Sequence, residues 1–386
     1  MALRAVATEF DEAKTRSDTS APAVVRLTLI DFRSYARAEF AIVPRPVVLT
    51  GPNGAGKTNL LEAVSFLAPG RGLRRAKLTE IDRRGGAGPW ALSIRLASAE
   101  GEVQIGTGRD AASETGERRI LRFDGVAAKS QAELAQRASL VWLTPQMDRL
   151  FTEGTSARRR FLDRLVSGFD PEHPARLSAH ERAMRERLRL LRHGGADASW
   201  LATLEDQMAT QGVAIAAARG QAVGQLAHAC AAGTGPFPRA GLAMDCAVDA
   251  LLARMPALAA EEELRRSLGE RRRLDGESGV TSVGPHRSDL AVYHLGNAMP
   301  AASCSTGEQK ALLIAILLAQ ARLLTGRRGH APLMLLDEVA AHLDAERRAA
   351  LFAELLGLKT QAWLTGTDAS LFAALRGQGG RRALGE

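Results

Sequence analysis

The chain has 386 residues, of which 46% are hydrophobic and 24% charged; this is ordinary for a folded protein of one large or two smaller domains and excludes wholesale disorder. Its formal net charge of +8 favours a polyanionic partner. Aromatic residues make up 4% of the chain, which argues against a surface of many stacked rings, the usual platform for single-stranded nucleic acid.

The first 150 residues are expected to contain mainly strands. Residues 1–24 are polar and lack periodicity, and we expect a flexible N-terminal tail there. Alternating apolar residues predict a strand at 24–32, and a short apolar run predicts another at 46–50. A helix at 59–67 and a loop rich in glycine and arginine at 70–89 precede further strand patterns at 90–98, 102–108, 118–127 and 139–145.

The composition shifts after residue 150 to alanine, arginine, leucine and glutamate with helical periodicity. Helices are expected at 156–192, 199–230 and 257–273, and strand character returns at 289–294. The remaining pattern predicts a helix at 307–324, a buried strand within 331–338, a helix at 346–356, a strand within 361–368 and a basic helical C-terminus. The apolar stretch 311–319 is about half of the ~18–20 residues that cross a bilayer, so we expect a buried helix and no membrane association.

The strongest motif follows the strand at 46–50 and precedes the helix at 59–67. It matches the pattern GxxxxGK[ST], in which glycines let backbone N–H groups surround phosphates at a helix N-terminus. Lysine in this pattern reaches the β- and γ-phosphates of ATP, and the hydroxyl that follows it binds Mg²⁺. The predicted ATP-binding residues are Gly51, Pro52, Asn53, Gly54, Ala55, Gly56, Lys57 and Thr58.

A second motif ends the apolar run 333–336 with two acidic residues, Asp337 and Glu338. A buried strand delivers such residues to the carboxyl edge of a sheet, where open α/β sheets bind ligands. We expect Asp337 to hold Mg²⁺ and Glu338 to orient or deprotonate an attacking water. Taken alone, the pair would equally suit an ordinary solvated turn; the phosphate loop decides between the two.

Two further segments are less specific. Ser305, Thr306 and Gly307 precede a long apolar helix, which suits either an anion contact or an ordinary helix cap with Glu308 in a capping box. The loop that contains Arg71, Arg74, Arg75 and Lys77 is a candidate DNA-binding segment, with an exposed polar loop as the equal alternative. The arginine-rich helices at 158–192 are most simply a solvated face paired with glutamates.

The order of phosphate loop, long interruption, STGEQ and LLLDE resembles the ABC-type ATPase heads, including those of SMC proteins. More specifically, the chain resembles the RecF family of bacterial recombinational repair and replication proteins. The similarity extends over about 25–368 and is carried by FRSY at 32–35, RRRFLD at 158–163, GPHRSDL at 284–290, STGEQKALLIAILLAQA at 305–321, LLDEVAAHLDAERR at 335–348 and WLTGTD at 363–368.

The resemblance implies further roles. Ser305, Thr306, Gly307 and Gln309 would form a signature that contacts ATP held by a second subunit, and Asp344 would lie in a loop that crosses the dimer interface. Gln146 would reach Mg²⁺ or water. Transporter ATPases carry a histidine after the strand that follows the catalytic glutamate, whereas this chain has TGTD at 365–368, which suggests slow hydrolysis.

We therefore expect an α/β protein with a P-loop ABC-type ATPase head at 25–150 and 281–386 and an inserted, mainly helical lobe at 151–280. The resemblance implies a cytoplasmic, ATP- and Mg²⁺-dependent protein that dimerises on duplex DNA or single-strand/duplex junctions. It also implies weak DNA-stimulated hydrolysis, a part in the DNA damage (SOS) response, and RecO and RecR as partners. The alternatives are an ATPase subunit of a transport system and an ATP-gated DNA clamp that does not hydrolyse.

Overall fold

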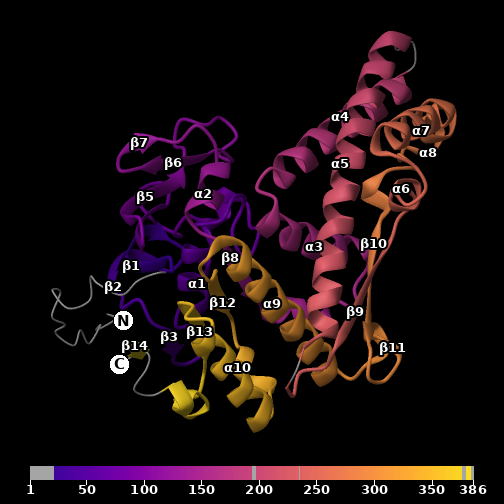
Figure 1. Ribbon diagram of the computed structural model, residues 1–386. Coiled ribbons are helices and arrows are strands. Elements are labelled where there is room, and N and C mark those ends of the chain that lie inside the picture. Colours follow the sequence, from indigo (N-terminus) through magenta and orange to yellow (C-terminus); the bar gives the residue numbers. More distant parts are fainter. Residues whose placement is uncertain (1–20, 194–196, 234, 376–379, 384–386) are drawn as a thin grey trace. The chain divides into compact units, whose positions relative to one another are not determined.

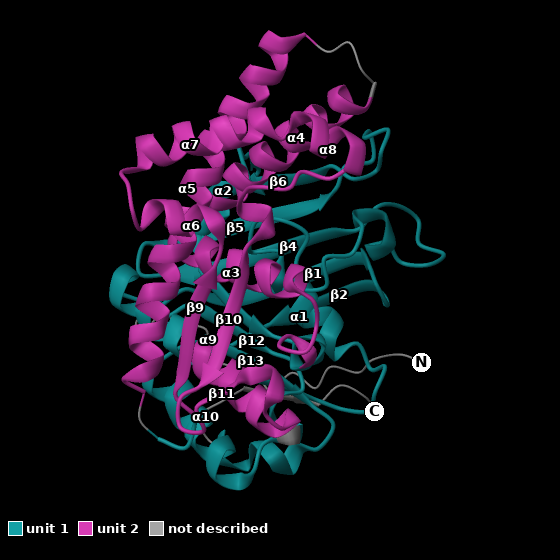
Figure 2. Cartoon of the chain, turned by 90° about the vertical axis from the view of Figure 1, so that its right-hand side faces the viewer, with its two compact units in different colours: residues 1–148, 235–237, 317–386 teal, residues 149–234, 238–316 magenta. Residues whose placement is uncertain are grey.

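The computed structural model describes residues 21–193, 197–233, 235–375 and 380–383 (Figure 1). The chain forms two compact units, coloured separately in Figure 2. Unit 1 comprises residues 1–148, 235–237 and 317–386, and unit 2 comprises residues 149–234 and 238–316. Residues 1–20 of the expected N-terminal tail lie outside the described residues, and the first strand already begins at Ala23.

Unit 1 contains an antiparallel sheet with the strand order β2-β1-β4-β5-β6-β7. The strands expected at 90–98 and 102–108 are confirmed and form a hairpin: β4 and β5 pair antiparallel from Ala91 opposite Gly108 to Ser98 opposite Gly101. The strands of this sheet are β1 (Ala23–Phe32), β2 (Tyr35–Ala41), β4 (Ala91–Ser98), β5 (Gly101–Arg109), β6 (Arg119–Phe123) and β7 (Val126–Ala127).

The second sheet of unit 1 is parallel throughout and has the order β14-β3-β13-β12-β8. All its carboxyl ends therefore lie along one edge, where α/β sheets bind ligands. Its strands are β3 (Val47–Thr50), β8 (Leu140–Leu143), β12 (Leu333–Leu336), β13 (Ala362–Gly366) and β14 (Gly380–Ala383). Every residue of β12 and β13 is buried, as expected for inner strands of a parallel sheet.

One hydrophobic core joins the two sheets of unit 1 to the helix that follows the phosphate loop. Phe32, Phe66 and Trp90 lie at its centre, and the rings of Phe32 and Trp90 pack edge to face with centroids 5.7 Å apart. The helices assigned wholly to unit 1 are α1 (Lys57–Ser65), α2 (Ala132–Arg137) and α10 (Ala345–Gly357).

Unit 2 is mainly helical and carries a small antiparallel sheet of order β11-β10-β9. Its helices are α3 (Thr155–Phe169), α4 (His173–His193), α5 (Ala198–Ala231), α6 (Ala247–Leu252), α7 (Ala257–Glu270) and α8 (Arg272–Ser278); its strands are β9 (Ala240–Asp245), β10 (Asp289–His294) and β11 (Met299–Pro300). Arg187 of α4 is fully buried and binds Glu205 of α5 at 2.9 Å and Asp275 of α8 at 2.7 Å.

Helix α9 (Thr306–Arg328) begins in unit 2 and ends in unit 1. It is long and apolar enough to cross a bilayer, but 72% of its most apolar 18-residue window is buried inside the protein. This burial is that of a core helix, as the sequence predicts for 311–319.

Three expectations differ from the structure. Residues 281–316, which we expected in the head, cluster with unit 2 instead. The described part of the C-terminal region has a 3₁₀ segment at Ala369–Leu375 and strand β14 in place of the expected helix. The inserted lobe is helical as expected, but strand β9 lies within it and pairs with β10 over six residues.

Candidate nucleotide-binding site

The phosphate loop connects β3 to α1, so it lies at the carboxyl edge of the parallel sheet. Gly54 and Gly56 have φ angles of +83° and +90°, a region that other residues rarely adopt. A Cβ atom on Gly56 would also lie 2.6 Å from the hydroxyl of Tyr35. These positions therefore require glycine, which is the reason the motif recurs in phosphate-binding loops.

Lys57 is 5% exposed, and its ammonium group is enclosed by the loop. Its Nζ donates to the carbonyl oxygens of Gly51 at 2.7 Å and Pro52 at 2.8 Å. These bonds hold the positive charge across the loop, where a lysine reaches the β- and γ-phosphates.

Thr58 and Asp337, which are 279 residues apart in the chain, meet beside this loop. The Thr58 hydroxyl donates to Oδ1 of Asp337 at 3.0 Å. Asp337 directly follows β12 and is 4% exposed. A hydroxyl and a carboxylate are the hard oxygen ligands that Mg²⁺ takes beside nucleotide phosphates, so these residues fit the predicted ion.

Thr365 of β13 begins the TGTD segment but received no site role from the sequence, and it organises the acidic pair. Strand β13 lies between β3 and β12, and the Thr365 side chain is fully buried. Its hydroxyl donates to Oδ1 of Asp337 at 2.7 Å and accepts from the backbone N–H of Glu338 at 2.8 Å. A buried hydroxyl in an otherwise apolar strand is the sequence signal that could have identified it.

Glu338 has a φ angle of +51°, in the left-handed region that non-glycine residues seldom occupy. The bond from its N–H to Thr365 helps to hold this conformation. Strained backbone of this kind is concentrated at functional sites, which agrees with the catalytic role expected for this residue.

Gln146 lies in a 3₁₀ segment, Pro145–Arg149, that is separated from the end of β8 by one residue. Because β8 and β12 are parallel neighbours with Leu143 opposite Leu336, this segment leaves the sheet at the same edge as Asp337. The Gln146 side chain is exposed.

The FRSY turn supports the phosphate loop through two hydrogen bonds. The hydroxyl of Tyr35 donates to the carbonyl of Gly56 at 3.2 Å, and Nδ2 of Asn59 donates to the hydroxyl of Ser34 at 2.9 Å. Burial raises the pKa of Tyr35 to about 12, so the phenol remains a donor throughout the physiological range. The sequence identifies this turn only through its resemblance to the family. The structure shows that its side chains form hydrogen bonds to the phosphate loop and the start of α1.

The expected signature residues belong to unit 2, whereas the phosphate loop and Asp337 belong to unit 1. Ser305 caps α9: Glu308 accepts from its N–H at 2.9 Å and from its hydroxyl at 2.8 Å. Those two bonds from Ser305 lower the pKa of Glu308. Ser305 and Thr306 are exposed, while Gln309 is buried and donates to the carbonyl of Cys304. The capping box is thus confirmed.

Asp344, expected in an interface loop, is the N-cap of α10. Its Oδ1 accepts from the backbone N–H of Arg347 at 2.8 Å. Its side chain remains 55% exposed, so the cap leaves much of the carboxylate accessible.

The four cations of the candidate DNA-binding loop differ in their surroundings. Arg74 is half-buried and bridges Glu62, at 3.0 Å, to Asn59 on α1. Glu62 is fully buried and also binds Arg33, so Arg74 helps to neutralise a buried carboxylate. Arg71 pairs with Glu117 at 3.3 Å, and Arg75 and Lys77 are exposed.

Comparison with known proteins shows the family to which the chain belongs. A family model described as the RecF/RecN/SMC N-terminal domain matches residues 23–373. A curated DNA replication and repair protein RecF from Rhizobium etli is 52% identical over 352 residues, which cover 91% of this chain and 94% of the relative. The chain belongs to the RecF family. RecF proteins of Mesorhizobium japonicum and Brucella suis are 50% and 49% identical, with 94% and 92% of their own lengths covered.

Two solved structures share the fold of this RecF family member. They are described as the recombination mediator protein RecF with ATP, or with ATPrS, in the RecFOR pathway. Each has a TM-score of 0.80 and 22% identity, and the match covers 92% of this chain and 94% of the solved chain. The predicted α/β fold, an ABC-type ATPase head with an inserted lobe, is confirmed.

Proposed function

We propose that this protein binds ATP and Mg²⁺ at the phosphate loop and uses them to control its binding to DNA in recombinational repair and replication restart. The observation that carries the proposal is the hydrogen bond between Thr58 and Asp337, because it unites the two predicted Mg²⁺ ligands beside Lys57. The names of the curated relatives, DNA replication and repair protein RecF, supply the process.

The residues of the site have distinct tasks in this proposal. Lys57 and the backbone of residues 51–56 bind the phosphates, and Thr58 and Asp337 hold the ion, which neutralises phosphate charge when bound. The Glu338 carboxylate accepts a proton from the attacking water, and Gln146 orients that water or the ion. Thr365 acts through Asp337 and Glu338 and is therefore a positioning residue.

The complete site forms between two subunits arranged head to tail. Ser305, Thr306, Gly307 and Gln309 of one subunit face the nucleotide of the other, and Asp344 lies along the same interface. Two facts support this arrangement: Ser305 and Thr306 are exposed at the start of α9, and they belong to a different compact unit from the phosphate loop. The ATP-bound dimer holds duplex DNA or a single-strand/duplex junction, and slow, DNA-stimulated hydrolysis releases it.

In the cell this protein would act in the cytoplasm with RecO and RecR and support the DNA damage (SOS) response. The pathway name in the descriptions of the two solved structures supports such partners. The charge of +8 suits a nucleic-acid partner better than the membrane complex of a transport ATPase.

Molar mass measured by light scattering tests the proposal. Wild-type protein with Mg²⁺ and ATP should double its mass, and it should bind a 30-bp duplex in that form but not in the ADP form. A mass that stays constant in all nucleotide states would refute the ATP-controlled dimer.

An ATP-gated clamp without hydrolysis is the second candidate, since the segment TGTD at 365–368 stands where transporter ATPases carry a histidine. Single-turnover measurements with radiolabelled ATP separate the two: cleavage of bound ATP on a time scale of minutes supports the ATPase, and intact ATP after hours supports the clamp.

A further inference from the structure

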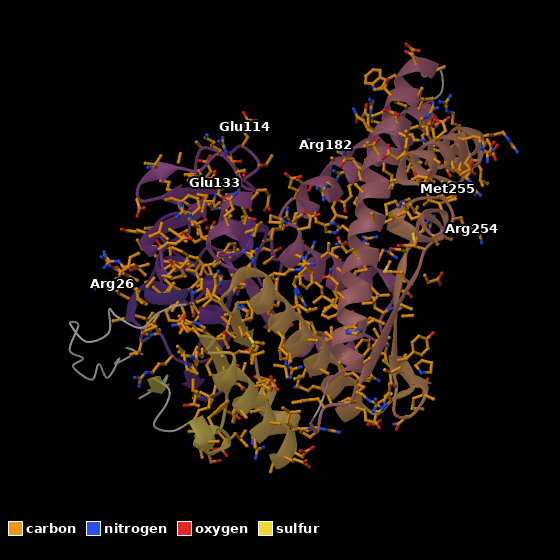
Figure 3. All side chains as sticks on the ribbon, in the orientation of Figure 1. Arg26, Glu114, Glu133, Arg182, Arg254 and Met255 are labelled. Carbon is orange, nitrogen blue, oxygen red and sulfur yellow. The ribbon has the colours of Figure 1, made fainter. Side chains whose placement is uncertain are left out.

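The exposed face of α4 carries four arginines in one stripe. Arg182, Arg185, Arg189 and Arg192 are separated by three, four and three residues, which places them on one side of a helix with 3.6 residues per turn. All four are exposed; Arg182 is labelled on this helix in Figure 3. The opposite side is buried and includes His180, so the stripe is a surface feature of unit 2.

Three of the four arginines in the stripe have no carboxylate partner among the described residues. Helix α4 contains six arginines and two glutamates. Arg176 pairs with Asp170 and Glu172, Arg187 is buried among carboxylates, and Arg189 pairs with Glu186. Among the described residues, the remaining three, Arg182, Arg185 and Arg192, have no carboxylate partner, although Arg192 donates to the carbonyl of Gly279.

Helix α7 of the same unit shows the opposite arrangement. Its exposed Arg265 and Arg266 are held by Glu262, Glu263 and Glu270 in ion pairs within one helical turn. Such pairs at i,i+3 and i,i+4 make a helix face nearly neutral. The basic stripe of α4 therefore has no counterpart on α7, where the exposed arginines are paired.

The chemistry of the stripe selects its ligand. Among the described side chains of α4, the other exposed positions are Ala175, Ser178 and Glu181, so this helix itself offers no exposed aromatic or large apolar anchor. Protein interfaces depend on such anchors, and single-strand binding depends on stacked rings. A row of guanidinium groups without anchors suits a polyanion contacted through its phosphates.

The dimensions fit a DNA strand. From Arg182 to Arg192 the helix advances ten residues, which corresponds to about 15 Å at 1.5 Å per residue. Phosphates of one strand of duplex DNA recur every ~3.4 Å of rise along the axis, so the length of the stripe is comparable with the axial rise of about four nucleotide steps. We propose that Arg182, Arg185, Arg189 and Arg192 bind the sugar–phosphate backbone of duplex DNA without sequence preference. This inference rests on the proposed DNA-binding function. It adds a second DNA-contact surface to the candidate DNA-binding loop of unit 1.

The test removes three charges from the stripe and compares the result with an equal removal elsewhere. The stripe variant is R182Q/R185Q/R192Q, and the matched control is R254Q/R265Q/R266Q, whose residues are exposed on or before α7. Both variants lower the net charge by the same amount, and glutamine keeps the helix propensity. Fluorescence anisotropy with a labelled 25-bp duplex of mixed sequence, at 50–200 mM salt with ATP, measures affinity and its salt dependence.

The stripe variant should bind the duplex roughly tenfold or more weakly at 100 mM salt, and its log–log salt slope should fall by about 0.9 for each phosphate that is no longer neutralised. The affinity of the control variant for the duplex should stay within about threefold of the wild-type affinity, because its arginines are outside the stripe. R182K/R185K/R192K should retain most of the binding, since a phosphate contact needs the charge more than the guanidinium shape. Unchanged thermal unfolding and ATP affinity in all variants would show that the fold and the nucleotide site are intact.

The outcomes separate this inference from the proposed function. Equal affinity and slope in the stripe and control variants, with wild-type binding intact, would overturn the stripe and leave the DNA-binding function standing. The stripe would also be overturned if the lysine variant bound duplex DNA as weakly as the glutamine variant. It would likewise be overturned if the stripe variant kept its affinity for DNA but lost binding to an acidic partner protein. Failure of the wild-type protein to bind duplex DNA at 50 mM salt would overturn both.

Discussion

Replacement of Thr365 by valine tests the organisation of the acidic pair most directly. Valine has nearly the shape of threonine, so the buried strand β13 should keep its packing while the hydroxyl is removed. Two hydrogen bonds disappear: the one to Asp337 at 2.7 Å and the one from the Glu338 N–H at 2.8 Å.

The magnitude follows from the type of each bond. A hydrogen bond to a charged group contributes about 1.5–3 kcal/mol, and one between neutral groups contributes about 1 kcal/mol. Thr365→Val should therefore lower the free energy of unfolding by roughly 2–4 kcal/mol. If about 2 kcal/mol of that also disappears from the transition state, ATP turnover should fall ~30-fold.

The measurements are urea unfolding followed by circular dichroism, and single-turnover ATP hydrolysis. Thr365→Ser is the control, because it keeps the hydroxyl and removes one methyl group; it should retain most of the turnover. Wild-type stability and turnover in Thr365→Val would refute the bridging role. Equal losses in the serine and valine variants would show that packing, not the hydroxyl, is responsible.

Four further outcomes test the rest of the site. Lys57→Ala should weaken ATP binding roughly 100-fold or more by calorimetry, because it removes a charge-assisted contact to phosphate. Glu338→Gln should bind ATP normally and lose at least ~100-fold in turnover, since the amide accepts no proton. Arg75→Glu with Lys77→Glu should lower duplex affinity and its salt slope while ATP affinity stays constant. Ser305→Arg should bind ATP yet remain a monomer by light scattering, and mixing it with Lys57→Ala should restore part of the ATPase activity, because one composite site then has both motifs intact.

The phosphate loop and the acidic pair could be predicted because each is a local pattern. A strand, a glycine-rich turn and a helix are adjacent in the chain, and so are an apolar run and two carboxylates. The order of the strands could not be predicted, because β3 and β12 are separated in the sheet by β13, the last of the three in the chain. The role of Thr365 depends on that order.

Strands β9 and β14 are among those that escaped prediction, and both form because of their pairing partners and not because of local propensity. Strand β9 has the sequence AGLAMD, in which alanine and glycine have low strand propensity, yet it pairs with all six residues of β10. Strand β14 is a basic segment that pairs with β3, more than 300 residues away in the chain. In both places the tertiary context overrides the intrinsic preference of the segment.

A count of charges in the sequence does not show which arginines are paired with carboxylates and which remain exposed. Residues 158–192 contain ten arginines and five acidic residues, and the sequence suggests a solvated face whose arginines pair with glutamates of the same helices. Folding sorts them instead: Arg158 pairs with Asp289, 131 residues away, and the partners of Arg187 are 18 and 88 residues away. Spacing rules within one helix reach no further than four residues and could not assign such pairs. Because distant carboxylates neutralise the buried arginines, the remaining positive charge of α4 is concentrated on its exposed side, where a polyanion can reach it.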